Sequence, residues 1–180
     1  NQEAMESYLA QPTNSSKHLV RFQYADKEDM FDGVSYQKGG RILNMLRQYL
    51  GDSAFFKGLN VYLTTNKFKN AEAHQLRLAM EEVSGKDLNW FFDQWYFGNG
   101  HPKVGIHYQF IDSANQLNVI VEQKQKDKLF YFPVEIDVYN NNNEAERATF
   151  WIGKQAVDTI RIAYSTKPVW VNVDPQKLML

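Results

Sequence analysis

A tyrosine near the start of a long helical pattern is the residue best placed to do chemistry. Tyr36 lies in the segment 31–40, FDGVSYQKGG, in the first turn of a helix predicted over 34–50 and off its apolar stripe. A phenol that points out of a helix start can donate a hydrogen bond to a developing oxyanion, and the helix dipole favours negative charge there. A tyrosine that packs against its neighbours fits the same spacing, so spacing alone leaves both interpretations open.

The histidines lack the spacing of a metal site. The chain has four of them, His18, His74, His101 and His107, and it has no cysteine. A helical zinc pair places two imidazoles on one helix face, as in His-Glu-x-x-His, and no such spacing occurs here. The absence of cysteine also removes thiol catalysis, disulfides and Cys-ligated metals. We therefore expect no metal site built by this chain alone.

Motifs for phosphate binding and serine hydrolysis are also absent. Gly39 and Gly40 are followed by Arg41, which breaks the P-loop pattern, and no Gly-x-Ser-x-Gly elbow occurs. Each glycine in a helix costs about 1 kcal/mol relative to alanine, so we expect a close approach of the backbone to another element or to a ligand at this pair. Glu81 and Glu82 fit a solvated helix face better than an acid–base pair.

The segment 90–97, WFFDQWYF, is dense in aromatic side chains. An aromatic binding pocket or a membrane contact would use such residues. A helix that is apolar on several sides is, however, normally buried between layers, so we expect core packing.

The elements that would position these residues fall into two parts, because apolar spacing changes from helical to alternating near 98–102. Helices are predicted over 1–9, 34–50 and 87–97, with two more between them, and short loops favour antiparallel packing. Gly51 should end the second helix and Ser84-Gly85 the fourth, whereas Asp52 and Asn70 should cap the third and fourth.

After residue 101 the chain reads as six short strands, predicted over 104–110, 117–121, 130–139, 149–152, 157–162 and 169–173. The four asparagines at 140–143 fit a solvated hairpin tip. Strands at this spacing suggest an antiparallel β-sandwich. The predicted class is therefore α+β in two domains, with a helical bundle over 1–100 and a β-sandwich over 101–180.

Composition narrows the function classes. The 180 residues are 43% hydrophobic and 23% charged, with a formal net charge of −1, which excludes a disordered chain and a basic nucleic-acid footprint. No apolar run approaches the ~18 residues that span a bilayer. The first residues show no signal-peptide pattern and no starting Met, so we expect a chain that is processed or cut from a longer one. Localisation is not indicated.

The segment 31–40 and the following ILNML at 42–46 resemble a stretch of the M1 family of zinc aminopeptidases, the gluzincins of the aminopeptidase N group. In that family a Tyr-x-Lys-Gly-small run opens a helix that continues to Met-Leu and Leu-Gly, as Leu50-Gly51 does here. SGKDL at 84–88, Trp95 and GHP at 100–102 resemble later landmarks. The resemblance is specific from about residue 18 to 102, and a β-sandwich follows the catalytic domain in many members. Gly40 stands where alanine is common.

The resemblance implies a metallopeptidase mechanism. In such enzymes two histidines and a glutamate hold a zinc that activates water, a second glutamate is the general base, and a tyrosine donates a hydrogen bond to the oxyanion. By motif match Tyr36 is that tyrosine. This chain lacks His-Glu-x-x-His, the downstream glutamate ligand and the Gly-x-Met-x-Asn motif that binds the amino terminus of the peptide substrate. It therefore resembles the C-terminal part of an M1 protein, in which an upstream half carries the zinc site, and alone it should neither bind catalytic zinc nor hydrolyse peptides.

Two other functions remain open on the sequence. The parent protein could be an M1-like scaffold without activity, because a fold does not guarantee its chemistry. The β-sandwich could also be an independent binding module for a glycan or a peptide. The preferred substrate residue is not encoded here, because the first specificity pocket would be formed largely upstream.

Overall fold

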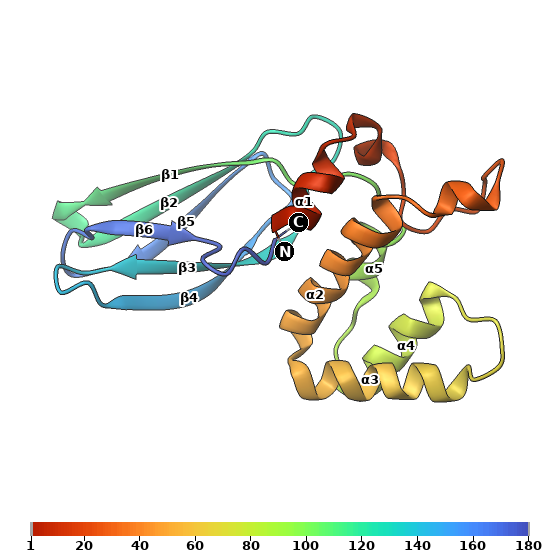
Figure 1. Cartoon of the computed structure of the whole chain (residues 1–180). Coiled ribbons are helices and arrows are strands. Elements are labelled where there is room, and N and C mark those ends of the chain that lie inside the picture. The colour runs from red at the N-terminus through yellow and green to blue at the C-terminus, as the bar shows by residue number, and fades with distance from the viewer. Residues whose placement is uncertain (1, 180) are drawn as a thin grey trace. The chain divides into compact units, whose positions relative to one another are not determined.

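The computed structural model describes residues 2–179, which divide into two compact units. One unit extends through Gly100 and the other from His101 to Met179. Figure 1 shows helices in the first unit and strands in the second. The predicted α+β class is therefore confirmed, and each unit is described by itself.

The first unit is built from five α-helices and three shorter helical turns among the described residues. These are α1 (Gln2–Leu9), η1 (Pro12–Ser16), η2 (Lys27–Met30), η3 (Val34–Lys38), α2 (Gly39–Leu50), α3 (Asp52–Thr65), α4 (Ala73–Ser84) and α5 (Asn89–Trp95). The predicted helix over 34–50 is thus two segments, a π-turn at η3 followed by α2.

Two helix ends were predicted correctly. Gly51, at φ 80°, ends α2, and Gly85, at φ 67°, ends α4 in the left-handed region. The two predicted caps were wrong. Asp52 is the first residue of α3, and its carboxylate binds Arg47, with Nε–Oδ1 at 2.8 Å. Asn70 lies three residues before α4, which begins at Ala73. The helix begins there because the Glu72 N–H donates to the Gln75 side chain at 2.6 Å.

The core of the helical unit uses the aromatic segment as predicted. Phe91, Phe92, Trp95 and Tyr96 are buried, together with Val34, Ile42, Leu46, Met80 and Leu88 from the other elements. Helices α3 and α4 approach each other closely at Gly58, where an added Cβ would lie 2.5 Å from the Met80 sulfur. Because Val34, Ile42 and Leu46 belong to this core, packing fixes the position of α2 and of the turn that contains Tyr36.

The second unit contains two three-stranded antiparallel sheets, with strand orders β1-β2-β5 and β4-β3-β6. The strands are β1 (Val104–Ile111), β2 (Gln116–Gln123), β3 (Phe132–Tyr139), β4 (Ala145–Ile152), β5 (Val157–Ala163) and β6 (Trp170–Val173). Each of the six predicted strands overlaps one of these. Asn140–Asn143 form the exposed β3–β4 turn, where the Asn140 side-chain oxygen accepts from the Asn142 and Glu144 amides.

Buried side chains recur at two-residue spacing in both sheets. Leu117, Val119 and Val121 of β2 are buried, and so are Val134 and Ile136 of β3. Each sheet therefore has one buried, apolar face.

Gln123 is a polar exception inside this core. It is 5% exposed, donates to the carbonyls of Phe130 at 2.8 Å and Gly153 at 3.1 Å, and accepts from the Phe130 amide at 2.9 Å. One amide side chain thus satisfies three backbone groups.

Candidate functional site

Tyr36 lies in the π-turn η3 and faces outward. The Lys38 amide donates to the Gly33 carbonyl at 3.0 Å, five residues back, and the Tyr36 amide donates to the Asp32 carbonyl at 3.1 Å. Such turns are rare and frequently mark functional positions. Tyr36 is 59% exposed, and its ring stacks on the exposed Phe31 with centroids 6.3 Å apart. The ring is therefore not sealed in the core, and an incoming group can reach it.

The residues after Tyr36 explain the rest of the Tyr-x-Lys-Gly motif. Lys38 is fully buried, so the turn directs Tyr36 outward and Lys38 inward. Gly39 meets Leu19, whose Cδ1 would lie 3.3 Å from an added Cβ, and this is the close approach expected from the sequence. Gly40 has no atom within 4 Å of an added Cβ, so no other element of the described residues approaches the second glycine, and the ligand alternative stays a prediction there.

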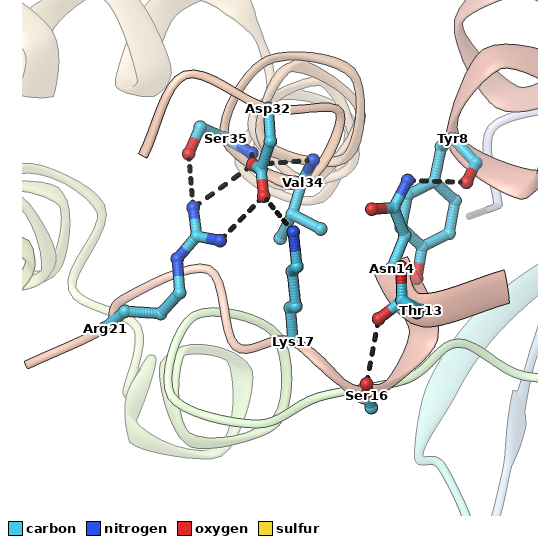
Figure 2. A network of polar contacts seen from close by, with 9 residues as sticks. All are labelled: Tyr8, Thr13, Asn14, Ser16, Lys17, Arg21, Asp32, Val34 and Ser35. Atoms are coloured by element: carbon cyan, nitrogen blue, oxygen red, sulfur yellow. Dashed lines mark hydrogen bonds and ion pairs between the residues drawn. The ribbon is translucent and has the colours of Figure 1, made fainter. Parts of the chain in front are cut away.

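Ahead of Tyr36, Asp32 is the centre of a charge cluster (Figure 2). Its Oδ2 accepts from Arg21 NH1 at 2.7 Å and from Lys17 Nζ at 2.9 Å, while its Oδ1 accepts from Arg21 NH2 at 3.1 Å. The same Oδ1 accepts from the backbone amides of Val34 at 3.1 Å and Ser35 at 2.9 Å. Arg21 NH2 also donates to the Ser35 hydroxyl at 2.8 Å.

The surroundings of Asp32 favour its ionised form. Although partial burial opposes ionisation, the hydrogen bonds from Arg21, the Ser35 amide and Lys17 hold the pKa of Asp32 well below its usual range. Asp32 therefore stays ionised through the ordinary pH range. Sequence reasoning missed this residue as a site candidate, although an Asp close before a helical run is a signal for a capping side chain.

A surface hollow adjoins the cluster. It has a volume of about 440 Å³ and is lined by Lys17, Arg21, Gln23, Tyr24, Glu28, Asp29, Met30, Phe31 and Asp32. Phe31 connects it to the site, because the same ring stacks on Tyr36. Open space therefore lies next to the Tyr36 turn.

The histidines have other partners. His18 shares a 2.6 Å hydrogen bond between its Nδ1 and the Phe97 carbonyl, and the His74 ring stacks on the Phe97 ring at 4.7 Å. His101 and His107 belong to the second unit. Within residues 2–179 no group of three His, Asp or Glu side chains could hold a metal ion. The residues present therefore do not fit a catalytic zinc.

Glu81 has a structural role rather than the solvated one expected. Its Oε2 accepts from Arg77 at 2.7 Å, and its Oε1 accepts from the Leu88 amide at 2.8 Å, which ties α4 to the start of α5.

None of the helices in the described part of the chain combines the length and the apolar content needed to cross a bilayer.

Comparison with known proteins decides the family. A sequence model described as "Peptidase family M1 domain" matches residues 2–95, which is more than half of the chain. The chain belongs to the peptidase M1 family. The match contains the Tyr36 turn, the Asp32 cluster and helices α2 to α5, so the resemblance based on the Tyr-x-Lys-Gly run is confirmed.

Two aminopeptidases are similar to this chain in sequence. A probable aminopeptidase 2 from Sulfurisphaera tokodaii is 30% identical over 154 residues, covering 82% of this chain and 18% of the relative. Aminopeptidase N from Lactococcus lactis is 37% identical over 109 residues, covering 58% of this chain and 13% of that protein. The chain thus spans less than a fifth of the length of these relatives.

A solved structure shares the fold. The crystal structure of Legionella pneumophila aminopeptidase A in complex with aspartic acid matches with a TM-score of 0.74 and 13% identity. The match covers 92% of this chain and 19% of that chain.

Proposed function

We propose that this chain supplies the oxyanion-stabilising tyrosine of an M1 zinc aminopeptidase, and that Tyr36 is this residue. The observation that carries the proposal is the position of Tyr36. It lies at the start of a long helix, inside the family match, on a π-turn that leaves the ring 59% exposed. In this proposal the zinc and the general base are held by a different part of the assembled enzyme, because the described residues offer no ligand cluster.

Tyr36 contributes through hydrogen bonding. When water adds to the scissile carbonyl of a peptide, negative charge develops on the carbonyl oxygen, and a phenol O–H aimed at that oxygen stabilises the charge more in the transition state than in the ground state. No hydrogen bond to a described residue competes for the Tyr36 hydroxyl, so the donor is available. Its partner is the part of the enzyme that carries the zinc site, and its substrate is the N-terminal end of a peptide.

The test is Tyr36→Phe in the enzyme that contains both this chain and its zinc-binding half. We expect kcat for release of the N-terminal residue from an amino-acid p-nitroanilide to fall by about 10²–10³, as loss of an oxyanion donor does, with KM little changed. The control is Tyr108→Phe, which removes the same hydroxyl from a tyrosine of similar exposure in the other unit, at 49%. Near-normal kcat for Tyr36→Phe would refute the assigned role.

The same assay separates this proposal from the scaffold alternative. An M1-like scaffold would release no N-terminal residue even with its zinc-binding half present. The 180-residue chain supplied with zinc is the remaining control, and we expect it to release none.

A further inference from the structure

We infer that Asp32 is the positioning residue for Tyr36, with Arg21 and Lys17 holding Asp32 in place. The inference rests on the proposed function and deepens it, because it names what sets the direction of the phenol.

Asp32 binds the backbone amides of three successive residues, the last of which is the tyrosine. Its carboxylate accepts from the amides of Val34 and Ser35, and its carbonyl accepts from the amide of Tyr36. One residue therefore fixes three successive N–H groups at the start of the π-turn. The side chain satisfies two of these groups, as a helix cap does, and the third bond is an ordinary backbone bond to the Asp32 carbonyl.

The direction of Tyr36 depends on this backbone. The residue is 59% exposed, and its ring stacks on that of Phe31, which is itself 66% exposed. A side chain with so little lateral packing takes its direction from its own Cα–Cβ bond. Whatever fixes the turn therefore aims the hydroxyl.

The cluster is anchored on a second segment. Arg21 bridges Asp32 and the Ser35 hydroxyl, and Lys17 adds a further bond to Asp32 (Figure 2). Two cations on one carboxylate hold it against rotation more firmly than a single pair does.

The turn is also held by packing at the next residue. An added Cβ on Gly33 would lie 3.1 Å from the Asn14 side-chain nitrogen, and Asn14 is buried and donates to the Tyr8 carbonyl at 2.9 Å. Charge at Asp32 and close packing at Gly33 thus restrain the turn from two directions.

The decisive experiment is a double-mutant cycle of Asp32→Asn and Tyr36→Phe in the enzyme that contains the zinc-binding half. Asn keeps the size and one acceptor oxygen but loses the charge that holds Arg21 and Lys17. We expect Asp32→Asn to lower kcat by about 10–100-fold, the effect of a displacement of about 1 Å, while KM is nearly unchanged. In the Tyr36→Phe background Asp32→Asn should lower kcat by no more than about twofold, because the phenol it positions is absent.

A second readout uses the 180-residue chain without any assay of activity. Asp32→Asn should accelerate hydrogen exchange of the Ser35 and Tyr36 amides, while amides in α3 keep their protection. The matched control is Asp87→Asn, because Asp87 accepts from the Asn89 amide at 2.8 Å at the start of another helix of the same unit. Asp87→Asn should leave both kcat and exchange at Tyr36 unchanged.

The outcomes separate the two proposals. A normal kcat for Asp32→Asn, or a loss that is equally large in the Tyr36→Phe background, overturns the positioning role and leaves the role of Tyr36 intact. A normal kcat for Tyr36→Phe overturns the proposed function and the positioning role together. If Asp32→Asn does not fold, as judged by circular dichroism, Arg21→Lys replaces it. This variant keeps the charge but replaces the planar guanidinium fork, whose two nitrogens bind Asp32 and Ser35, with a single ammonium group. The same loss of kcat and the same non-additivity are expected.

Discussion

Two glycines in the helical unit should respond to the same substitution with opposite signs. By helix propensity alone, changing Gly58 in α3 or Gly40 in α2 to alanine should stabilise its helix by about 1 kcal/mol. They differ in what the new methyl group meets. At Gly40 nothing lies within 4 Å, so the gain is kept and Gly40→Ala should stabilise the unit by about 0.5–1 kcal/mol.

At Gly58 the methyl group would lie 2.5 Å from the Met80 sulfur, 3.3 Å from the Met80 Cα and 3.5 Å from the Ala79 carbonyl oxygen. The Met80 side chain is fully buried, so its sulfur cannot move without disturbing the core, and the other two atoms are backbone. Overpacking of this kind costs about 2–3 kcal/mol, which exceeds the gain in propensity. Gly58→Ala should therefore destabilise the unit by about 1–2 kcal/mol.

Thermal unfolding followed by circular dichroism at 222 nm reports on the helices. For a unit of this size 1 kcal/mol shifts Tm by roughly 4–8 °C, so Gly40→Ala should raise Tm and Gly58→Ala should lower it by at least about 4 °C. Each variant is the control for the other. If Gly58→Ala raises Tm as Gly40→Ala does, the close approach of α3 and α4 does not constrain this position, and the reasoning is refuted.

Two further predictions concern the sheet unit. Gln123→Leu should destabilise it by about 1–3 kcal/mol, because the Phe130 amide and the Gly153 carbonyl lose their buried partner. Urea unfolding followed by Trp151 and Trp170 fluorescence would measure this loss, and an unchanged midpoint would contradict it. The Asp137 carboxylate accepts from Arg147 at 2.7 and 2.8 Å, and these hydrogen bonds are the main reason that its pKa is lowered. The pair should therefore stabilise the unit above the ordinary carboxyl pKa and lose this contribution as pH falls through the lowered value. Asp137→Asn should flatten the fall of Tm in acid, and an unchanged slope would count against the pair.

Much of the fold followed from periodicity. The six strands and the ends of α2 and α4 were predicted because alternating spacing and Gly51 and Gly85 are local signals. The caps at Asp52 and Asn70 were not predictable in this way. Arg47, five residues earlier, binds the Asp52 carboxylate. The start of α4 is fixed instead by the pairing of Glu72 with Gln75.

The candidate site was only partly readable. Tyr36 was found from its motif and from its place at a helix start. The Asp32 cluster was missed because Arg21 and Lys17 lie 11 and 15 residues earlier in a stretch without periodicity, so no local pattern connects them. The π-turn was missed because a shift from four-residue to five-residue hydrogen bonding leaves no mark on side-chain type.

The strand order of the second unit has a consequence for how the chain folds. β2 pairs with β5 across the intervening β3–β4 hairpin, and β3 pairs with β6 across β4 and β5. The last strand of each sheet therefore follows strands of the other sheet along the chain. The helices α3 and α4, by contrast, meet their partner directly along the chain. Proteins rich in distant pairings fold more slowly than those with local contacts. Refolding of this chain should therefore show a fast helical phase and a slower phase in which the interleaved strands close.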